Sequence, residues 1–189
     1  MDIMQRYHAA YPGLTEVFSI GKSVQGRELM VMRISNPIDS SQAPKPKMKW
    51  IANMHGNEAT GHEICIHFIQ YLLDNYGLDD RVTHIVDTID VHIMPSLNPD
   101  GHEVARDSAC GRYGGRENAA GYDLNRNFPD QFEGTKQRIQ PETQAVLDWL
   151  DRTHFVLSAN LHDGSKASAA AIFHPPRPVP TPHVIRLAS

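Results

Sequence analysis

Residues 48–77 read MKWIANMHGNEATGHEICIHFIQYLLDNYG, and this stretch predicts a strand that leads directly into a helix. Residues 48–54 are rich in apolar side chains and end at His55, which places this histidine at the C-terminal end of a strand. From residue 59 to residue 76, Ile64, Phe68 and Leu72 recur every four positions, the spacing of one helix face. Gly77 then supplies a helix stop.

The rest of the chain continues the alternation of strands and helices. Further strands are predicted over residues 14–20, 28–34, 88–95 and 155–161, and a further helix over residues 141–152. The first two strands are expected to form a β-hairpin or adjacent antiparallel strands, and the last is predicted to be a nearly all-buried strand that delivers His162 at its C-terminal end. Residues 98–138 predict a long loop, and long loops in compact domains are usually functional. The pattern predicts an α/β fold with ligands at the C-terminal ends of the strands.

The composition favours one globular domain and excludes several partners. The 189 residues are 40% hydrophobic and 21% charged, with a formal net charge of -4. Because Lys and Arg are scattered, no nucleic-acid partner is expected. No stretch is long and apolar enough to predict a membrane segment, and the N-terminus has no pattern of a secretion signal. With only two cysteines in the chain, the fold is not expected to depend on disulfides.

Two zinc-site spellings compete between residues 55 and 67. His62 and His67 are five positions apart, about 140° around a helix, so they cannot share one ion. His55 and Glu58 lie instead where strand passes into helix, and His162 is the natural third ligand. Two histidines and one carboxylate leave a fourth zinc position open, as catalytic sites require. Read alone, a His and a Glu at this spacing are more often ordinary surface or capping residues.

Five ordered motifs carry a family resemblance between about residues 11 and 165. They are HGNE at 55–58, NPDG at 98–101, GREN at 115–118, DLNRNF at 123–128 and LSANLH at 157–162. Together they resemble the zinc metallocarboxypeptidases, specifically the regulatory branch that contains carboxypeptidases N, E, M and D. The resemblance implies an α/β/α sandwich around a mixed, mainly parallel sheet, of which this chain holds roughly the N-terminal half, truncated after the third ligand.

The resemblance also implies roles for individual residues. His55, Glu58 and His162 match the ligands of one zinc ion, and Arg116 matches the arginine that stabilises the developing oxyanion. Asn125 and Arg126 match the pair that grips the C-terminal carboxylate of a peptide or protein substrate. Without the motifs around them, Arg116 and Arg126 would be assigned to surface salt bridges.

The sequence departs from the family after His162. The family continues His-Gly-Gly, whereas this chain has Asp163 after the histidine, and residues 163–189 contain neither Glu nor Tyr. We therefore expect a partial catalytic domain over residues 1–165, followed over residues 166–189 by a divergent, irregular tail rich in proline. Phe173 stands where the regulatory branch has the aspartate that favours C-terminal Arg or Lys, so this specificity rests on the resemblance alone.

These departures leave three readings of function open. The first is a zinc carboxypeptidase that lacks the general-base glutamate and is weakly active or inactive. The second is a non-catalytic module that binds the carboxylates of peptide C-termini, and the third is a nonproductive truncated isoform. The resemblance implies a secreted protein or one of the secretory pathway.

Overall fold

The computed structural model describes residues 2–39, 44–107, 114–129 and 137–163. Its strands are β1 (Thr15–Lys22), β2 (Glu28–Ile34), β3 (Lys47–Ala52), β4 (Asp90–Met94) and β5 (Phe155–Leu161). Its helices are α1 (Asp2–Ala10), α2 (Ala59–Asn75), α3 (Asp80–Thr88), α4 (Pro99–Asp107), the short 3₁₀ helix η2 (Leu124–Arg126) and α5 (Pro141–Arg152).

The five strands form one mixed sheet in the order β1-β2-β4-β3-β5. Strand β2 pairs antiparallel with β1 and with β4, whereas β3 pairs parallel with β4 and with β5. The parallel half of the sheet is therefore β4-β3-β5. Because β3 and β5 are parallel neighbours, their C-terminal ends meet at the same edge, where the predicted ligands follow.

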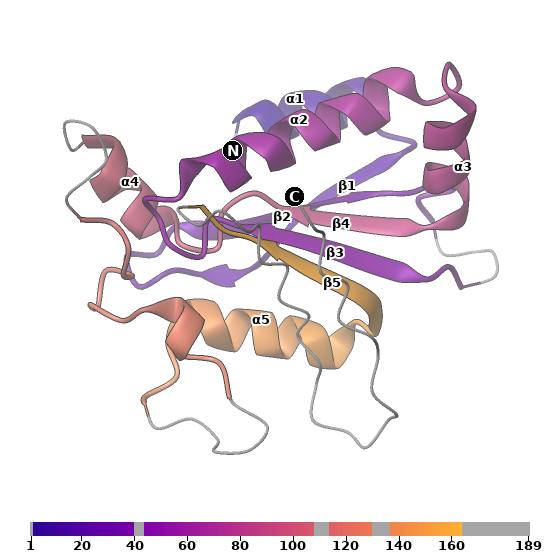
Figure 1. Ribbon diagram of the computed structural model, residues 1–189. Coiled ribbons are helices and arrows are strands. Elements are labelled where there is room, and N and C mark those ends of the chain that lie inside the picture. Colours follow the sequence, from indigo (N-terminus) through magenta and orange to yellow (C-terminus); the bar gives the residue numbers. More distant parts are fainter. Residues whose placement is uncertain (1, 40–43, 108–113, 130–136, 164–189) are drawn as a thin grey trace.

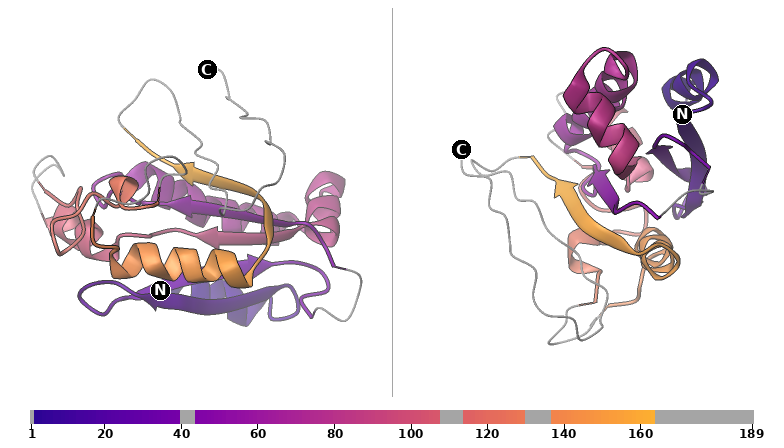
Figure 2. Two further views of the ribbon diagram at one scale, coloured as in Figure 1. Left: turned by 90° about the horizontal axis from the view of Figure 1, so that it is seen from below. Right: turned by 90° about the vertical axis from the view of Figure 1, so that its right-hand side faces the viewer.

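Helices cover both faces of the sheet, as Figures 1 and 2 show. One apolar core packs α1, α2 and α3 against one face, with Ile69, Leu72 and Val86 buried. A second core packs α5 against the other face through Val146 and Trp149. The predicted α/β/α sandwich around a mixed sheet is thus confirmed. None of the helices among the described residues is long and apolar enough to cross a membrane.

The predicted loop over residues 98–138 is wrong at its start, because residues 99–107 form helix α4. The Asn-Pro-Asp-Gly sequence that suggests a turn also satisfies the rules for a helix start. Asn98 accepts a hydrogen bond from the amide of Gly101 at 2.9 Å, and Pro99 occupies the first helical position. The remaining part of the predicted loop contains η2, and residues 108–113 and 130–136 lie outside the described residues.

Strand β5 is less buried than its apolar sequence predicts. Its last residues pack into the sheet, but Val156 is 67% exposed and Leu157 36% exposed. The physical reason is position, because β5 pairs only with β3 among the described strands and is the terminal strand in their order. The predicted tail, residues 166–189, lies outside the described residues and stays a prediction.

Lys49 is buried in the middle of the sheet, and we expect its replacement by methionine to stabilise the protein. The residue is 0% exposed, and burial lowers the pKa of its ammonium from 10.5 to about 8. Lys49→Met removes the cost of burying that charge, on the order of 2 to 3 kcal/mol at pH 7. Lys47→Met, at the half-buried start of β3, is the matched control and should change little.

The buried Lys49 ammonium should make the stability of the wild type depend on pH. Between pH 8 and 10.5 the unfolded chain holds the Lys49 proton more tightly than the folded chain does. The free energy of unfolding of the wild type therefore rises with pH across that window. Urea denaturation at several pH values should show this rise in the wild type and not in Lys49→Met. An equal rise in both proteins would contradict the assignment.

Candidate metal centre

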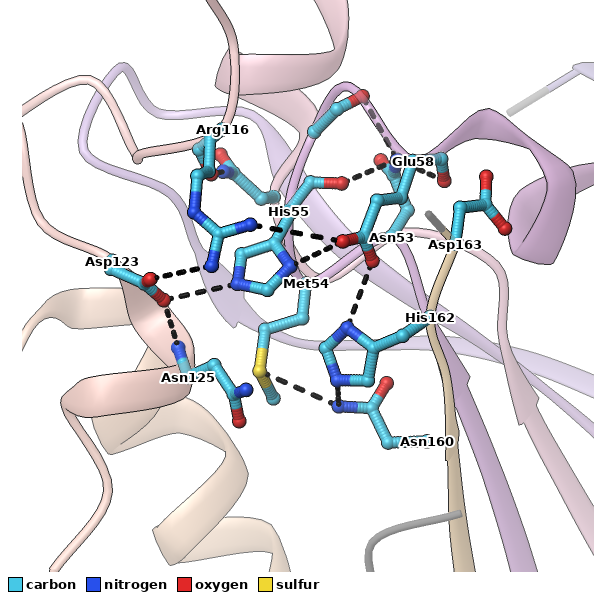
Figure 3. A network of polar contacts seen from close by, with 12 residues as sticks. Asn53, Met54, His55, Glu58, Arg116, Asp123, Asn125, Asn160, His162 and Asp163 are labelled. Atoms are coloured by element: carbon cyan, nitrogen blue, oxygen red, sulfur yellow. Dashed lines mark hydrogen bonds and ion pairs between the residues drawn. The ribbon is translucent and has the colours of Figure 1, made fainter. Parts of the chain in front are cut away.

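The sheet brings the three predicted ligands together from distant parts of the sequence. Ala52 of β3 and Leu161 of β5 are register partners, and His162 follows β5 directly. His55 stands three residues beyond the end of β3, and Glu58 is the N-cap residue of α2. Figure 3 shows the three side chains facing one another.

The distances fit a shared ion. One ligand atom from each of His55, Glu58 and His162 can be chosen so that all lie within 4.8 Å of one another. Nδ1 of His55 lies 2.7 Å from Oε1 of Glu58, and Nδ1 of His162 lies 2.8 Å from Oε2. His55 is 2% exposed and Glu58 9% exposed, so the donors converge in a largely water-excluded place.

Asp123 fixes the orientation and the tautomer of His55. One of its carboxylate oxygens lies 3.0 Å from Nε2 of His55, so the imidazole donates its Nε2–H to this oxygen. In the neutral ring Nδ1 then carries a lone pair instead of a hydrogen, and it faces a carboxylate oxygen of Glu58 at 2.7 Å. Two acceptors at this distance require a positive charge between them, either a proton or a metal ion. The donor set therefore fits a divalent cation, and zinc is commonly held by histidine nitrogen and carboxylate oxygen.

Arg116 joins the same network. Its guanidinium donates to Oδ2 of Asp123 at 2.9 Å, and another of its nitrogens lies 3.9 Å from Oε1 of Glu58. Burial raises the pKa of the Asp123 carboxyl, but the hydrogen bonds and charges of His55 and Arg116 outweigh it and lower the pKa below its ordinary value. Asp123 is thus held as a carboxylate. The side chain of Arg116 is 45% exposed, so its guanidinium borders the three ligands from the solvent side.

The two predicted clamp residues lie on η2, next to this network. The backbone amide of Asn125 donates to Oδ1 of Asp123 at 2.9 Å. This bond ties the start of η2 to the carboxylate that contacts His55. Arg126 is exposed, and its guanidinium donates to the carbonyl oxygen of Asn125 at 3.3 Å. The structure therefore brings Arg116 and Asn125 to the ligands through Asp123 and leaves the charge of Arg126 facing solvent.

The His162 side has its own orienting neighbour, Asn160. Its amide nitrogen lies 3.3 Å from Nε2 of His162, and its amide oxygen is buried with no partner among the described residues. For Nδ1 of His162 to bind a cation, Nε2 must carry the proton. With the Asn160 amide turned by 180°, its oxygen would accept a hydrogen bond from that N–H, and its nitrogen would give up the 3.4 Å contact with Sδ of Met54.

Asp163, the residue that departs from the family pattern, caps helix α2. Its Oδ2 accepts a hydrogen bond from the amide of Thr60 at 2.9 Å. Glu58 occupies the N-cap position without making a side-chain cap. Asp163 therefore satisfies a helix amide that a metal-ligating Glu58 leaves open.

The cluster of His55, Glu58 and His162 among the described residues does not include His62 or His67. His62 stacks on His102 with ring centroids 5.0 Å apart, and His67 is exposed on α2. Sequence reasoning missed the roles of Asp123, Asn160 and Asp163. Asp123 lies in the same motif as the predicted clamp residues, and Asn160 and Asp163 lie within two positions of His162, so their polar side chains were the available signal.

Two histidines and one glutamate that converge beside the C-terminal ends of parallel strands are the donor set of one class of catalytic zinc sites, those with one coordination position left for water or substrate. The comparison with protein families narrows this class. The family model for zinc carboxypeptidases, peptidase M14, matches residues 1–186. The chain belongs to this family.

Individual relatives fall in the regulatory branch. The chain is 50% identical to duck carboxypeptidase D (Anas platyrhynchos) over 162 residues, which cover 86% of this chain and 12% of that protein. It is 47% identical to mouse carboxypeptidase M (Mus musculus) over 155 residues, which cover 82% of this chain and 35% of the relative. The chain thus spans far less than two thirds of the length of either relative.

A solved structure agrees in fold. The crystal structure of thrombin activatable fibrinolysis inhibitor superimposes with a TM-score of 0.75 at 24% identity. The match covers 86% of this chain and 45% of the other chain. The likeness supports the carboxypeptidase fold of the described residues.

Proposed function

We propose that the chain binds one zinc ion through His55, Glu58 and His162 and forms the metal- and carboxylate-binding part of a carboxypeptidase. The observation that carries the proposal is the convergence of the three ligand atoms within 4.8 Å, with Asp123 directing Nδ1 of His55 toward them. Zinc in this place would polarise a scissile carbonyl and acidify a water molecule. The domain limits of this part are proposed as residues 1–165.

Two arginines are proposed to supply positive charge opposite the negative charges of the substrate. Arg116 borders the ligands with a half-exposed guanidinium and is proposed to stabilise negative charge that develops on the scissile carbonyl oxygen. Asn125 and the exposed Arg126 are proposed to hold the terminal carboxylate, since a planar guanidinium fork suits a bidentate carboxylate. A charged clamp beside the metal would select a chain that ends there, which is exopeptidase action on peptides or proteins.

Two finer points rest on the relation to the regulatory branch. Removal of C-terminal Arg or Lys is proposed from the resemblance of the five motifs to the regulatory branch, and so is a place in the secretory pathway. We assign the role of general base to none of the described residues.

A second function shares the same site: a module that holds peptide C-termini without cleaving them. The exposed charge of Arg126 favours it, since carboxylate binding needs no base. Peptides ending in Arg, Lys or Phe, and the same peptides with amidated C-termini, separate the two functions when free amino acid and bound peptide are both measured. Chelator-sensitive release supports the enzyme, and binding without release supports the module.

Two controls test whether the terminal carboxylate of the peptide is the group that binds. Amidated peptides lack the terminal carboxylate and should neither bind nor react. Arg126→Gln should weaken binding of the free-acid peptide by roughly 10-fold or more, because a charged hydrogen bond is lost. Equal behaviour of amidated and free-acid peptides would contradict both functions.

A further inference from the structure

Asn53 lies between the end of β3 and the loop that carries His55 and Glu58. Its side chain is fully buried, at 0% exposure, and its backbone φ is 54°, the left-handed region that residues other than glycine seldom adopt. Asparagine tolerates this region better than most residues. A glycine would adopt it more readily still, so the backbone alone does not account for an asparagine here.

The side-chain amide of Asn53 accounts for it. Its nitrogen lies 3.1 Å from the carbonyl oxygen of His55, 3.0 Å from that of Gly56 and 3.1 Å from that of Glu58. An amide nitrogen has two hydrogens, so one of them is shared between two carbonyls. One side chain thus satisfies three buried carbonyls of a four-residue loop that contains two of the three ligands.

The other end of the amide is fixed as well. Oδ1 of Asn53 accepts a hydrogen bond from the hydroxyl of Ser96 at 2.8 Å, and this bond determines that the nitrogen faces the loop. The loop itself has little regular structure, with one short backbone bond from the Glu58 amide to the His55 carbonyl at 3.0 Å. The His55 carbonyl also accepts from the Glu58 amide, and the Gly56 carbonyl lies 3.3 Å from Nδ1 of His102, but Asn53 is the side chain that joins all three carbonyls. Without Asn53 the three carbonyls would lose this common donor, and the loop that carries His55 and Glu58 would be held less firmly.

We infer that Asn53 is a positioning residue for the metal centre, holding His55 and Glu58 in the mutual geometry that one cation needs. The inference rests on the proposed zinc binding and deepens it. Figure 3 shows Asn53 directly beside the ligand pair. Asn53 itself would not touch the ion, and its effect would pass through the backbone of the two ligands.

Two substitutions separate the amide from the backbone conformation. Asn53→Gly keeps the left-handed backbone and removes the three hydrogen bonds. Asn53→Asp keeps the size and places an oxygen against three carbonyl oxygens. Both are expected to weaken zinc about 10- to 100-fold in competition with a chromophoric chelator, the range for groups that orient metal ligands. Both should also alter the visible absorption of the cobalt-substituted full chain.

A metal-free readout and two controls make the outcome decisive. In Asn53→Gly the amide hydrogen of Glu58 should exchange faster than in the wild type, because its loop is no longer held. Ser96→Ala, which releases only the far end of the amide, should weaken zinc less and in the same direction. Gly77→Ala strains a left-handed residue at the far end of α2, where a Cβ meets nothing, and should leave zinc affinity unchanged.

The results that overturn the inference differ from those that overturn the proposed function. If the wild type binds zinc and Asn53→Gly binds it equally, with an unchanged cobalt spectrum and equal amide exchange, Asn53 has no positioning role. If Asn53→Gly does not fold, an unchanged affinity and spectrum in Ser96→Ala overturns the inference instead. If the wild type itself binds no zinc, the proposed function fails and the inference falls with it.

Discussion

Replacing His162 with alanine is expected to abolish stoichiometric zinc binding. The substitution removes one of three protein donors and leaves His55 and Glu58, which come from a single loop. If zinc binding is worth about 12 kcal/mol and the donors share it roughly equally, the loss is about 4 kcal/mol, or roughly 1000-fold in affinity. The measurement is zinc per chain after dialysis against a weak chelator.

The control for this substitution is His67→Ala, which removes an exposed histidine on α2 and should keep one zinc per chain. A thermal shift adds a second readout, because an ion that binds only the folded state raises the midpoint by mass action. Added zinc should raise the midpoint of the wild type and of His67→Ala but not of His162→Ala. Equal zinc content in all three proteins would remove His162 from the centre.

The alternation of strands and helices could be predicted from the sequence because apolar periodicity reports burial directly. Helix α2 and the strands that end near His55 and His162 lie where their patterns predict them. Helices α1, α3 and α4 were not predicted, because each has only nine residues and a short apolar face. Asp79 accepts hydrogen bonds from the amides of Arg81 and Val82, and such a cap was the available signal for α3.

The ligands could be predicted for a different reason. Parallel neighbouring strands bring their C-terminal ends to one edge, so two histidines that each follow a strand become candidates for one site. The orienting residues could not be found this way. Asp123 reaches His55 across 68 positions of sequence, and the three bonds of Asn53 depend on a left-handed backbone that no periodicity reports.

Burial of β5 was the expectation that failed on physical grounds. A run of apolar residues predicts a strand covered on both sides, and Val156 is nevertheless 67% exposed. An apolar sequence indicates that burial of the strand would be favourable, whereas the burial of each side chain depends on which elements lie beside the strand. Among the described residues only β3 pairs with β5.

Gly56→Ala is expected to destabilise the fold by about 3 kcal/mol, since backbone and not a flexible side chain blocks the added methyl group. A Cβ at Gly56 would overlap the carbonyl carbon of Gly101 and the amide nitrogen of His102. The ligand loop therefore packs directly on the backbone of α4, and only glycine allows this approach. To accept the methyl group, either α4 or the loop must move.

The same displacement should cost metal binding, because Gly56 separates His55 from the rest of the ligand loop. Urea denaturation gives the loss of stability, and zinc content of the folded fraction gives the loss of the site. Gly13→Ala is the matched control, since a Cβ there meets nothing within 4 Å, and it should change neither quantity appreciably. If Gly56→Ala unfolded at the wild-type urea concentration and kept its zinc, the loop over residues 55–58 would not pack directly on the backbone of α4, and the prediction would be wrong.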